Sequence, residues 1–203
     1  MARPVIYYIY DPMCSWCWGY RNTWLTLVRH LEAIVDIRYL VGGLAPDSDE
    51  IMPDDMQAFL QQTWQKIAEQ LGVSFNFDFW TLCTPRRSTY PACRATLVAR
   101  DYDKEKAMLH AIQSAYYCDA KNPSDNEVLI SLAKDIGIND EEFREKLTSK
   151  DVNTKLFDEI AFVRKLPING FPSLVLKVNG RYIGIPLDYL DYTKTLAAIK
   201  QTL

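Results

Sequence analysis

The feature that most constrains this chain is a pair of cysteines, Cys14 and Cys17, between an apolar run and an amphipathic stretch. Residues 4–10 are almost all apolar and do not alternate, which is typical of a central strand buried on both faces. An Asp–Pro pair ends this run. Between Tyr20 and Leu31 apolar residues recur at spacings of three and four, which predicts a helix. The two cysteines are therefore expected at a strand-to-helix turn.

This position suits thiol–disulfide chemistry. The start of a helix favours negative charge, and the thiolate is the form of cysteine that attacks a disulfide. Cys14 is expected to be the more exposed nucleophile, and Cys17, one turn further on, the thiol that resolves a mixed disulfide. Their spacing puts both sulfurs on one helix face, so that a bond closes with little backbone movement. Between them, Ser15 is expected to donate a hydrogen bond to a sulfur, and Trp16 to offer an apolar surface to an unfolded client.

Two other interpretations of the pair are weaker. A zinc site needs two more ligands, usually from a second C-x-x-C or an H-x-x-H, and His30 and His110 are isolated. No metal site is therefore expected. Two inert thiols are also disfavoured, because a core helix seldom needs two cysteines at its exposed start. Cys83, Cys93 and Cys118 have no partner at redox spacing and are expected to be packing thiols.

A second candidate element precedes a predicted strand over residues 173–178. Only about 5% of X–Pro bonds are cis in folded proteins, so an ordinary trans Pro172 is the base expectation. Its position before a strand that should run beside the N-terminal one favours a cis bond, which would direct the backbone of Phe171 at an incoming peptide. Asp11, three residues before Cys14, is either a turn former or a carboxylate for proton transfer to the buried thiol.

The middle of the chain, residues 46–150, carries helical patterns and little strand signal. One apolar stripe runs over residues 56–71, and Gly72 follows it as a stop signal. Pro91 suits the first turn of another helix. The run Ser124-Asp125-Asn126-Glu127 matches a capping box at the start of a third. This block is therefore expected to be a helical insertion domain.

The end of the chain returns to mixed structure. A helical stripe over residues 152–163 precedes the strand at 173–178, and Asn179-Gly180 is a strong hairpin signal before a returning strand at 181–185. A terminal helix is expected from Tyr189 onward. The element order predicts an α/β protein of two domains: a β-α-β and α-β-β-α domain over 1–45 and 151–203, and the insertion over 46–150.

Charge and composition limit the classes of partner that this chain is expected to bind. A net charge of -3 over 203 residues gives nucleic-acid binding no electrostatic support, and no apolar run is long enough to cross a bilayer. The N-terminal apolar run lacks a small-residue cleavage site, so a cytoplasmic protein without a signal peptide is expected. The expected partner is a thiol- or disulfide-containing protein or small molecule. Arg86-Arg87 is either a solvated loop or a site for an acidic ligand such as glutathione.

The run from Asp11 to Gly19, D-P-M-C-S-W-C-W-G, with the helical insertion and the late Gly-Phe-Pro, resembles the DsbA-like family over essentially the whole chain. It looks most similar to the cytoplasmic FrnE-type branch. The resemblance implies a thioredoxin fold interrupted by a helical domain. It also implies Cys14 as nucleophile, Cys17 as resolving thiol, and Pro172 as a cis-proline facing them. The redox-active disulfide would need no further cofactor, with glutathione as a co-substrate to consider.

The sequence departs from periplasmic DsbA between the two cysteines, where it has Ser15-Trp16 in place of Pro-His. This change removes a histidine that would stabilise the thiolate, so we expect a disulfide reductase or isomerase rather than a strong oxidant. Two alternatives stay open. One is a glutathione-dependent transferase or isomerase, similar to the kappa-class transferases and hydroxychromene-carboxylate isomerases, which carry serine at the position of Cys14. The other is a thioredoxin-fold adaptor without catalysis.

Overall fold

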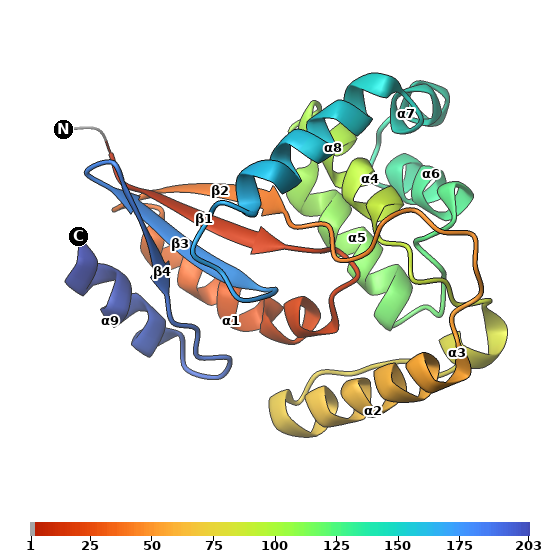
Figure 1. The fold of residues 1–203 in the computed structure, drawn as a ribbon, viewed down its shortest axis with the longest axis horizontal. Coiled ribbons are helices and arrows are strands. Elements are labelled where there is room, and N and C mark those ends of the chain that lie inside the picture. The colour runs from red at the N-terminus through yellow and green to blue at the C-terminus, as the bar shows by residue number, and fades with distance from the viewer. Residues whose placement is uncertain (1–2) are drawn as a thin grey trace. The chain divides into compact units, whose positions relative to one another are not determined.

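The computed structural model describes residues 3–203 of the chain; the first two residues of the predicted 1–45 segment lie outside the described part. The chain forms two compact units. One comprises Met1–Gly42 and Glu159–Leu203, and the other comprises Gly43–Asp158. Figure 1 shows one sheet and a larger number of helices, which confirms the predicted α/β class.

The first unit is built on a four-stranded sheet with strand order β2-β1-β3-β4. The first two strands are parallel, and both other pairings are antiparallel. Two helices, α1 and α9, lie side by side on one face of this sheet (Figure 1). This unit contains β1 (Val5–Tyr10), α1 (Ser15–Leu31), β2 (Asp36–Val41), β3 (Ser173–Val178), β4 (Arg181–Ile185) and α9 (Tyr192–Thr202). It also includes the end of α8 (Lys150–Val163), from Glu159 onward.

Strand β1 is buried on both faces, as its apolar run predicts. Toward α1, Tyr8 stacks on Trp24 with ring centroids 4.4 Å apart, and the Trp24 Nε1–H donates to the Tyr39 hydroxyl at 2.9 Å. On the opposite face, Tyr7 belongs to an apolar cluster that includes Val163 from the end of α8. The central strand is thus fixed from both sides, and with it the point at which α1 begins.

The β3–β4 hairpin turns at Asn179 and Gly180, whose φ angles of 50° and 78° are those of a type I′ turn. The terminal helix begins at Tyr192 rather than at Tyr189. Its N-cap is Asp191, whose carboxylate accepts from the Thr193 N–H at 3.0 Å. The apolar spacing placed the start three residues too early, because the residues before Asp191 form a turn of their own.

The second unit is helical among the residues that the structure describes. A single tryptophan, Trp64 of α2, lies at the centre of its aromatic core, with Tyr116 5.4 Å away by ring centroids. Gly72 ends α2 in the left-handed conformation, φ 66°. The four-residue α3 was not predicted, since it is too short to show a period. The helices of the second unit are α2 (Asp54–Leu71), α3 (Phe79–Leu82), α4 (Tyr90–Arg100), α5 (Glu105–Tyr117), α6 (Asn126–Asp135), α7 (Asp140–Leu147) and most of α8 (Lys150–Val163).

The predicted capping box at residues 124–127 is wrong. Helix α6 begins at Asn126, its N-cap is Asp125, and no side chain caps it. The buried Ser124 hydroxyl instead donates to the Ser88 carbonyl at 2.7 Å. Asp125 pairs with Arg86. A tertiary hydrogen bond has taken the side chain that the local pattern assigned to the helix end.

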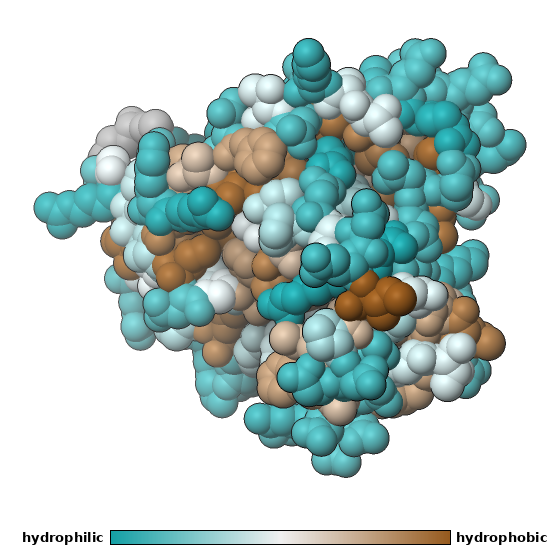
Figure 2. Space-filling view, turned by 45° about the vertical axis from the view of Figure 1, so that its right-hand side comes forward, coloured by the Kyte–Doolittle hydropathy of each residue, from teal (hydrophilic) through white to brown (hydrophobic). Residues whose placement is uncertain are grey.

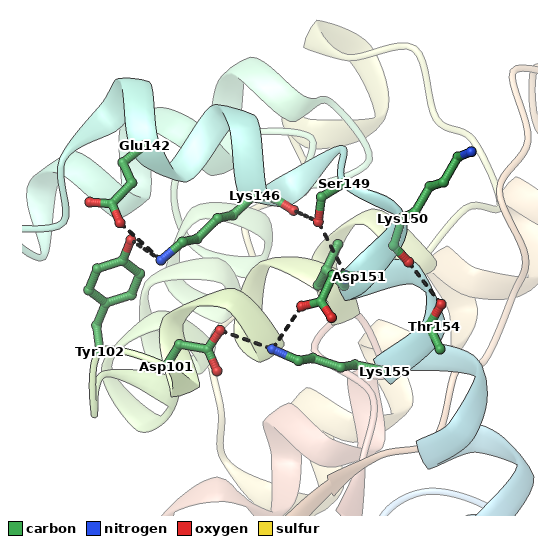
Figure 3. Close-up of polar contacts among 10 residues, drawn as sticks. Asp101, Tyr102, Glu142, Lys146, Ser149, Lys150, Asp151, Thr154 and Lys155 are labelled. Carbon is green, nitrogen blue, oxygen red and sulfur yellow. Dashed lines mark hydrogen bonds and ion pairs between the residues drawn. The ribbon is translucent and has the colours of Figure 1, made fainter.

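A hydrogen bond from α7 and an ion pair from α8 reach the turn between α4 and α5 (Figure 3). Lys146 of α7 contacts the Tyr102 hydroxyl at 2.8 Å and the Glu142 carboxylate at 2.9 Å. Lys155 of α8 contacts Asp101 at 3.1 Å. Exposed pairs of this kind add little to the free energy of unfolding.

Among the described residues, no helix combines the length and apolar character needed to span a bilayer. Several large apolar side chains are nevertheless exposed, among them Ile51, Leu82 and Leu190. The face shown in Figure 2 displays such brown residues among a majority of teal and white ones. Exposed apolar side chains of this kind are ordinary on a protein surface.

Candidate functional site

The cysteine pair lies where the sequence predicts it, at the turn between β1 and α1. Cys14 is the N-cap of α1 with extended backbone angles, and its N–H donates to the Asp11 carbonyl at 3.1 Å. Cys17 lies in the first turn of the helix. Both are free thiols; Cys14 is 7% exposed and Cys17 0%. Cys14 is therefore the sulfur that a substrate can reach first.

The structure brings Phe171 and Pro172 to this turn. The Phe171–Pro172 peptide bond is cis, and the Cys14 thiol donates to the Phe171 carbonyl at 3.4 Å. Pairing between β1 and β3 explains the approach, because Ser173 is opposite Ile9, near the end of β1 from which the chain turns into α1. A main-chain acceptor thus lies beside the accessible sulfur.

The ring of Phe171 faces a different way from its carbonyl. It packs against the apolar cluster of the first unit and lies directly over Gly42. A Cβ atom on Gly42 would fall 2.0 Å from this ring. The side chain of Phe171 therefore anchors this segment, and the expected contact between its backbone and a substrate stays a prediction.

Cys17 is held as a neutral thiol. Burial raises the pKa of its thiol well above the usual range, and the hydrogen bond with Cys14 raises this pKa further. Asp11 acts in both directions: its backbone hydrogen bond lowers the Cys17 pKa, and its charge raises it. Cys17 therefore keeps its proton until a base removes it.

Asp11 is fully buried. Its Oδ1 accepts from the Met13 N–H at 2.8 Å, so it forms the turn that leads into α1. The same carboxylate interacts electrostatically with Cys17. The turn-forming and proton-accepting interpretations of Asp11 are thus compatible in one geometry.

The two residues between the cysteines differ in exposure. Ser15 is buried, and Trp16 is half-buried with its ring edge-to-face against Tyr189, centroids 5.4 Å apart. Tyr189 lies in the loop between β4 and α9 and not in the terminal helix, where the apolar spacing predicts it. No local signal identifies it, since only the folded chain brings it to Trp16.

The remaining cysteines lie in the second unit and differ from one another. Cys93 is buried in α4, as expected for a packing thiol. Cys83 is half-buried and donates to the Ala120 carbonyl at 3.0 Å. Cys118 is exposed at the end of α5, so the packing expectation is wrong there; as the C-cap residue it lies where the chain leaves the helix. None of the five cysteines, all of which lie in the described residues, forms a disulfide.

The predicted loop Arg86-Arg87 divides into two environments. Arg86 is half-buried and paired with Asp125, while Arg87 is exposed and contacts the Met56 sulfur at 3.5 Å. Within the described residues, no cluster of three or more His, Cys, Asp or Glu side chains could hold a metal ion.

A cysteine pair at the first turn of the helix after a central strand, beside a cis-proline, defines a dithiol site of the thioredoxin type. Residues 5–194 match the DSBA-like thioredoxin domain, and the chain belongs to this family. The predicted membership is thereby confirmed at the level of the family.

Solved structures agree on the fold. A proposed protein disulfide isomerase from Nitrosomonas europaea has a TM-score of 0.88 at 24% identity, covering 98% of this chain and 97% of its own. The cytosolic disulfide reductase DsbM from Pseudomonas aeruginosa has a TM-score of 0.78 at 24% identity, covering 98% of both chains. A second DsbM structure contains glutathione and has a TM-score of 0.75 at 23% identity, covering 98% of both chains.

Curated relatives include proteins named as adapters. The ClpXP adapter protein SpxH from Bacillus subtilis is 24% identical over 87% of this chain. The SpxH of Halalkalibacterium halodurans is 23% identical over the same share. The matches span 62% and 63% of the length of those two relatives.

Proposed function

We propose that this protein is a thiol–disulfide oxidoreductase that reduces or isomerises disulfides through Cys14 and Cys17. The observation that carries the proposal is the difference between the two sulfurs. Cys14 is the more accessible and lies beside the Phe171 carbonyl, whereas Cys17 is fully buried with a raised thiol pKa. An attacking sulfur and a reserved resolving sulfur need this asymmetry.

In the first step the Cys14 thiolate attacks a substrate disulfide. A bond forms between Cys14 and one substrate sulfur, the substrate S–S bond breaks, and the other sulfur leaves as a thiolate that takes up a proton. The substrate backbone pairs with the main chain at Phe171 and Pro172, in the manner of strand addition, and its side chains contact Trp16. The helix start, to which Ser15 belongs, favours the negative charge on the attacking sulfur.

In the second step Cys17 loses its proton and attacks the sulfur of Cys14. The Cys14–Cys17 disulfide forms, and the second substrate sulfur leaves as a thiol after taking up a proton. Asp11 is the proposed acceptor of the Cys17 proton, because its buried carboxylate interacts with that thiol. Two electrons and two protons pass from the dithiol to the substrate.

A reductant must then regenerate the dithiol, and we propose glutathione for this role. The proposal rests on the glutathione-containing structure of DsbM, whose fold this chain shares. A cytoplasmic location is likewise proposed, since DsbM is described as cytosolic. Membership of the FrnE-type branch stays a prediction, and so does independence from any other cofactor.

The first test is the reduction potential of the Cys14–Cys17 couple, measured by equilibration against glutathione redox buffers. For a two-electron couple, about 30 mV shifts the equilibrium tenfold. We expect a value near the reducing end of the thioredoxin-fold range and reduction of a model disulfide by the dithiol protein. A pair that forms no disulfide in any of these buffers would rule the proposal out.

Substitutions assign the two steps. Cys14→Ser is expected to abolish reduction of the disulfide, and Cys17→Ser to trap a mixed disulfide on Cys14 that mass spectrometry detects. Cys118→Ser is the matched control, because it removes an exposed thiol of the second unit. Loss of activity in this control to the same degree would show that the dithiol site is not responsible.

The second candidate function is an adaptor that binds a partner protein without catalysis, and its support is the similarity to SpxH at 23% and 24% identity. Cys14→Ser separates the two classes. A pure adaptor would keep its partner binding in this variant, whereas an oxidoreductase would lose its turnover.

A further inference from the structure

The loop between β4 and α9 is fixed by one carboxylate. Asp188 accepts hydrogen bonds from the backbone N–H groups of Leu190 at 3.0 Å and Asp191 at 2.8 Å, and from Lys194 Nζ at 2.7 Å. Its own N–H donates to the Thr195 hydroxyl at 3.0 Å. These contacts, the one with Lys194 first, lower the pKa of Asp188 to about 2. These four contacts hold the loop between β4 and α9 in the conformation that the structure shows.

Tyr189 is the residue that this loop delivers to the dithiol helix. Its carbonyl accepts from the Thr23 hydroxyl of α1 at 2.5 Å. Its ring meets Trp16 and Tyr20 edge-to-face, with centroids 5.4 and 5.3 Å away and interplanar angles of 69° in both contacts. Trp16 and Tyr20 are four residues apart, on one face of the helix. One aromatic ring thus spans the first turns of α1, on which Cys17 lies.

The ring also belongs to the surroundings of the sulfurs. The pKa of Tyr189 is raised, mainly by burial and then by the nearby Cys17 and Cys14. The other titratable groups that interact with Cys17 are Tyr8 of β1, and Asp11 and Cys14 of the turn. Tyr189 is therefore the residue of the β4–α9 loop that lies near the resolving thiol.

We propose that Tyr189 is a positioning residue of the dithiol site, whose ring holds Trp16 and Tyr20 in place and keeps water away from Cys17. In this role it contributes to the burial that keeps Cys17 protonated before the mixed disulfide forms. The contacts are ring to ring, so the aromatic body carries the effect and the hydroxyl does not. This role of Tyr189 matters for turnover only if the proposed oxidoreductase function is correct, and it rests on that proposal.

The test measures alkylation of Cys17 in the reduced protein, resolved by peptide mass spectrometry, from neutral to alkaline pH. In Tyr189→Ala we expect water to reach Cys17 and its alkylation at neutral pH to rise about tenfold, the change that a pKa one unit lower produces. Tyr189→Phe keeps the ring and is expected to follow the wild type. Equal profiles for Tyr189→Ala and wild type, or a Tyr189→Phe profile as altered as that of Tyr189→Ala, would overturn the proposal.

Two further variants serve as controls, one for a general effect of the loop and one for misfolding of Tyr189→Ala. Leu190→Ala removes the exposed neighbour on the same loop and should leave the Cys17 profile unchanged. A Leu190→Ala profile shifted as far as that of Tyr189→Ala would assign the effect to the loop and overturn the role of the ring. If circular dichroism shows that Tyr189→Ala does not fold, Thr23→Val carries the test. It removes the hydrogen bond to the Tyr189 carbonyl and should raise Cys17 alkylation by a smaller factor, and an unchanged profile would count against the proposal.

The alkylation assay uses no disulfide substrate, so its result does not depend on whether the protein turns over a substrate. A shifted Cys17 profile in a protein that reduces no disulfide would uphold the role of Tyr189 and reject the proposed function. Normal turnover in wild type with an unshifted Tyr189→Ala profile would do the reverse.

Discussion

At the scale of single residues, the two cysteines differ because one is an N-cap and the other is enclosed. Cys14 ends an extended segment and keeps some contact with solvent, while Cys17 faces the aromatic side of the sheet near Tyr8. The spacing of two residues places Cys14 at the helix start and Cys17 in its first turn, and packing against the rest of the unit encloses Cys17. For that reason the sequence was sufficient to predict which cysteine would be the more accessible.

The raised pKa of Cys17 makes stability depend on alkaline pH. The unfolded chain ionises this thiol near pH 9, whereas the folded protein holds it neutral to higher pH. The stabilisation is thus fully present below pH 9 and is lost as pH rises toward the folded pKa, with a slope of at most about 1.4 kcal/mol per pH unit. We expect reduced wild type to lose more stability above pH 9 than Cys17→Ala, as measured by urea unfolding.

The comparison with Cys17→Ala is needed because buried tyrosines respond in the same direction. Burial also raises the pKa of Tyr8 and Tyr20. Both proteins share the burial that is the largest cause of the tyrosine shifts, so the difference between their stability curves reports the Cys17 thiol together with its interaction with Tyr8. Parallel curves across the alkaline range would show that Cys17 is not held neutral by the fold.

Other residues of the site could not be predicted individually. Tyr189 is adjacent to no motif, and Phe171 turns its ring away from the site that its carbonyl serves. Both facts depend on contacts between segments more than a hundred residues apart. Spacing along the chain contains no record of such contacts.

At the scale of elements, the dithiol site depends on close packing between the end of β2 and the segment before β3. Gly42 follows β2, and the Phe171 ring occupies the space that any larger side chain would need. Phe171 in turn holds its carbonyl beside the Cys14 sulfur. A glycine outside the cysteine motif therefore controls the geometry of the site.

Gly42→Ala is accordingly expected to lower the free energy of unfolding by about 1–3 kcal/mol, the usual cost of an overpacked core, and to slow disulfide reduction. Urea unfolding and a turnover assay measure the two effects. Gly42→Ala combined with Phe171→Leu provides the control, since a smaller side chain relieves the overlap and should restore part of the stability. Additive losses in the double variant would show that the two residues do not interact.

Most helices and strands were predictable, since apolar periodicity, Gly72 and the Asn179-Gly180 turn act locally. The exceptions have two causes, an element too short to show a period and side chains with tertiary partners. Helix α3 is a single turn, the start of α6 loses Ser124 to a tertiary hydrogen bond, and α9 starts late because Asp188 organises the preceding loop. Where a side chain has two available partners, sequence spacing identifies only the local one.

At the scale of the whole molecule, the redox state is expected to change the stability of the protein. The dipeptide between the cysteines, Ser15-Trp16, carries no cationic side chain to favour a thiolate. We therefore expect the disulfide form to be at least as stable as the dithiol form, as is required of a reductant. Thermal unfolding of the oxidised and reduced proteins measures the difference. A reduced form that melts several degrees higher would identify an oxidant instead. For a two-electron couple, a stability difference of about 1.4 kcal/mol between the two forms corresponds to about 30 mV in reduction potential.

The chain leaves the sheet-containing unit after Gly42 and returns to it at Glu159. At this junction the Val41 N–H donates to the Glu159 carboxylate at 2.6 Å, so the points of departure and return are hydrogen-bonded neighbours. An insert whose two ends are held together can lengthen, shorten or be exchanged with only a slow, logarithmic change in the entropy of closing the loop. Evolution is therefore free to change the length of the helical unit while the dithiol site of the first unit is inherited unchanged.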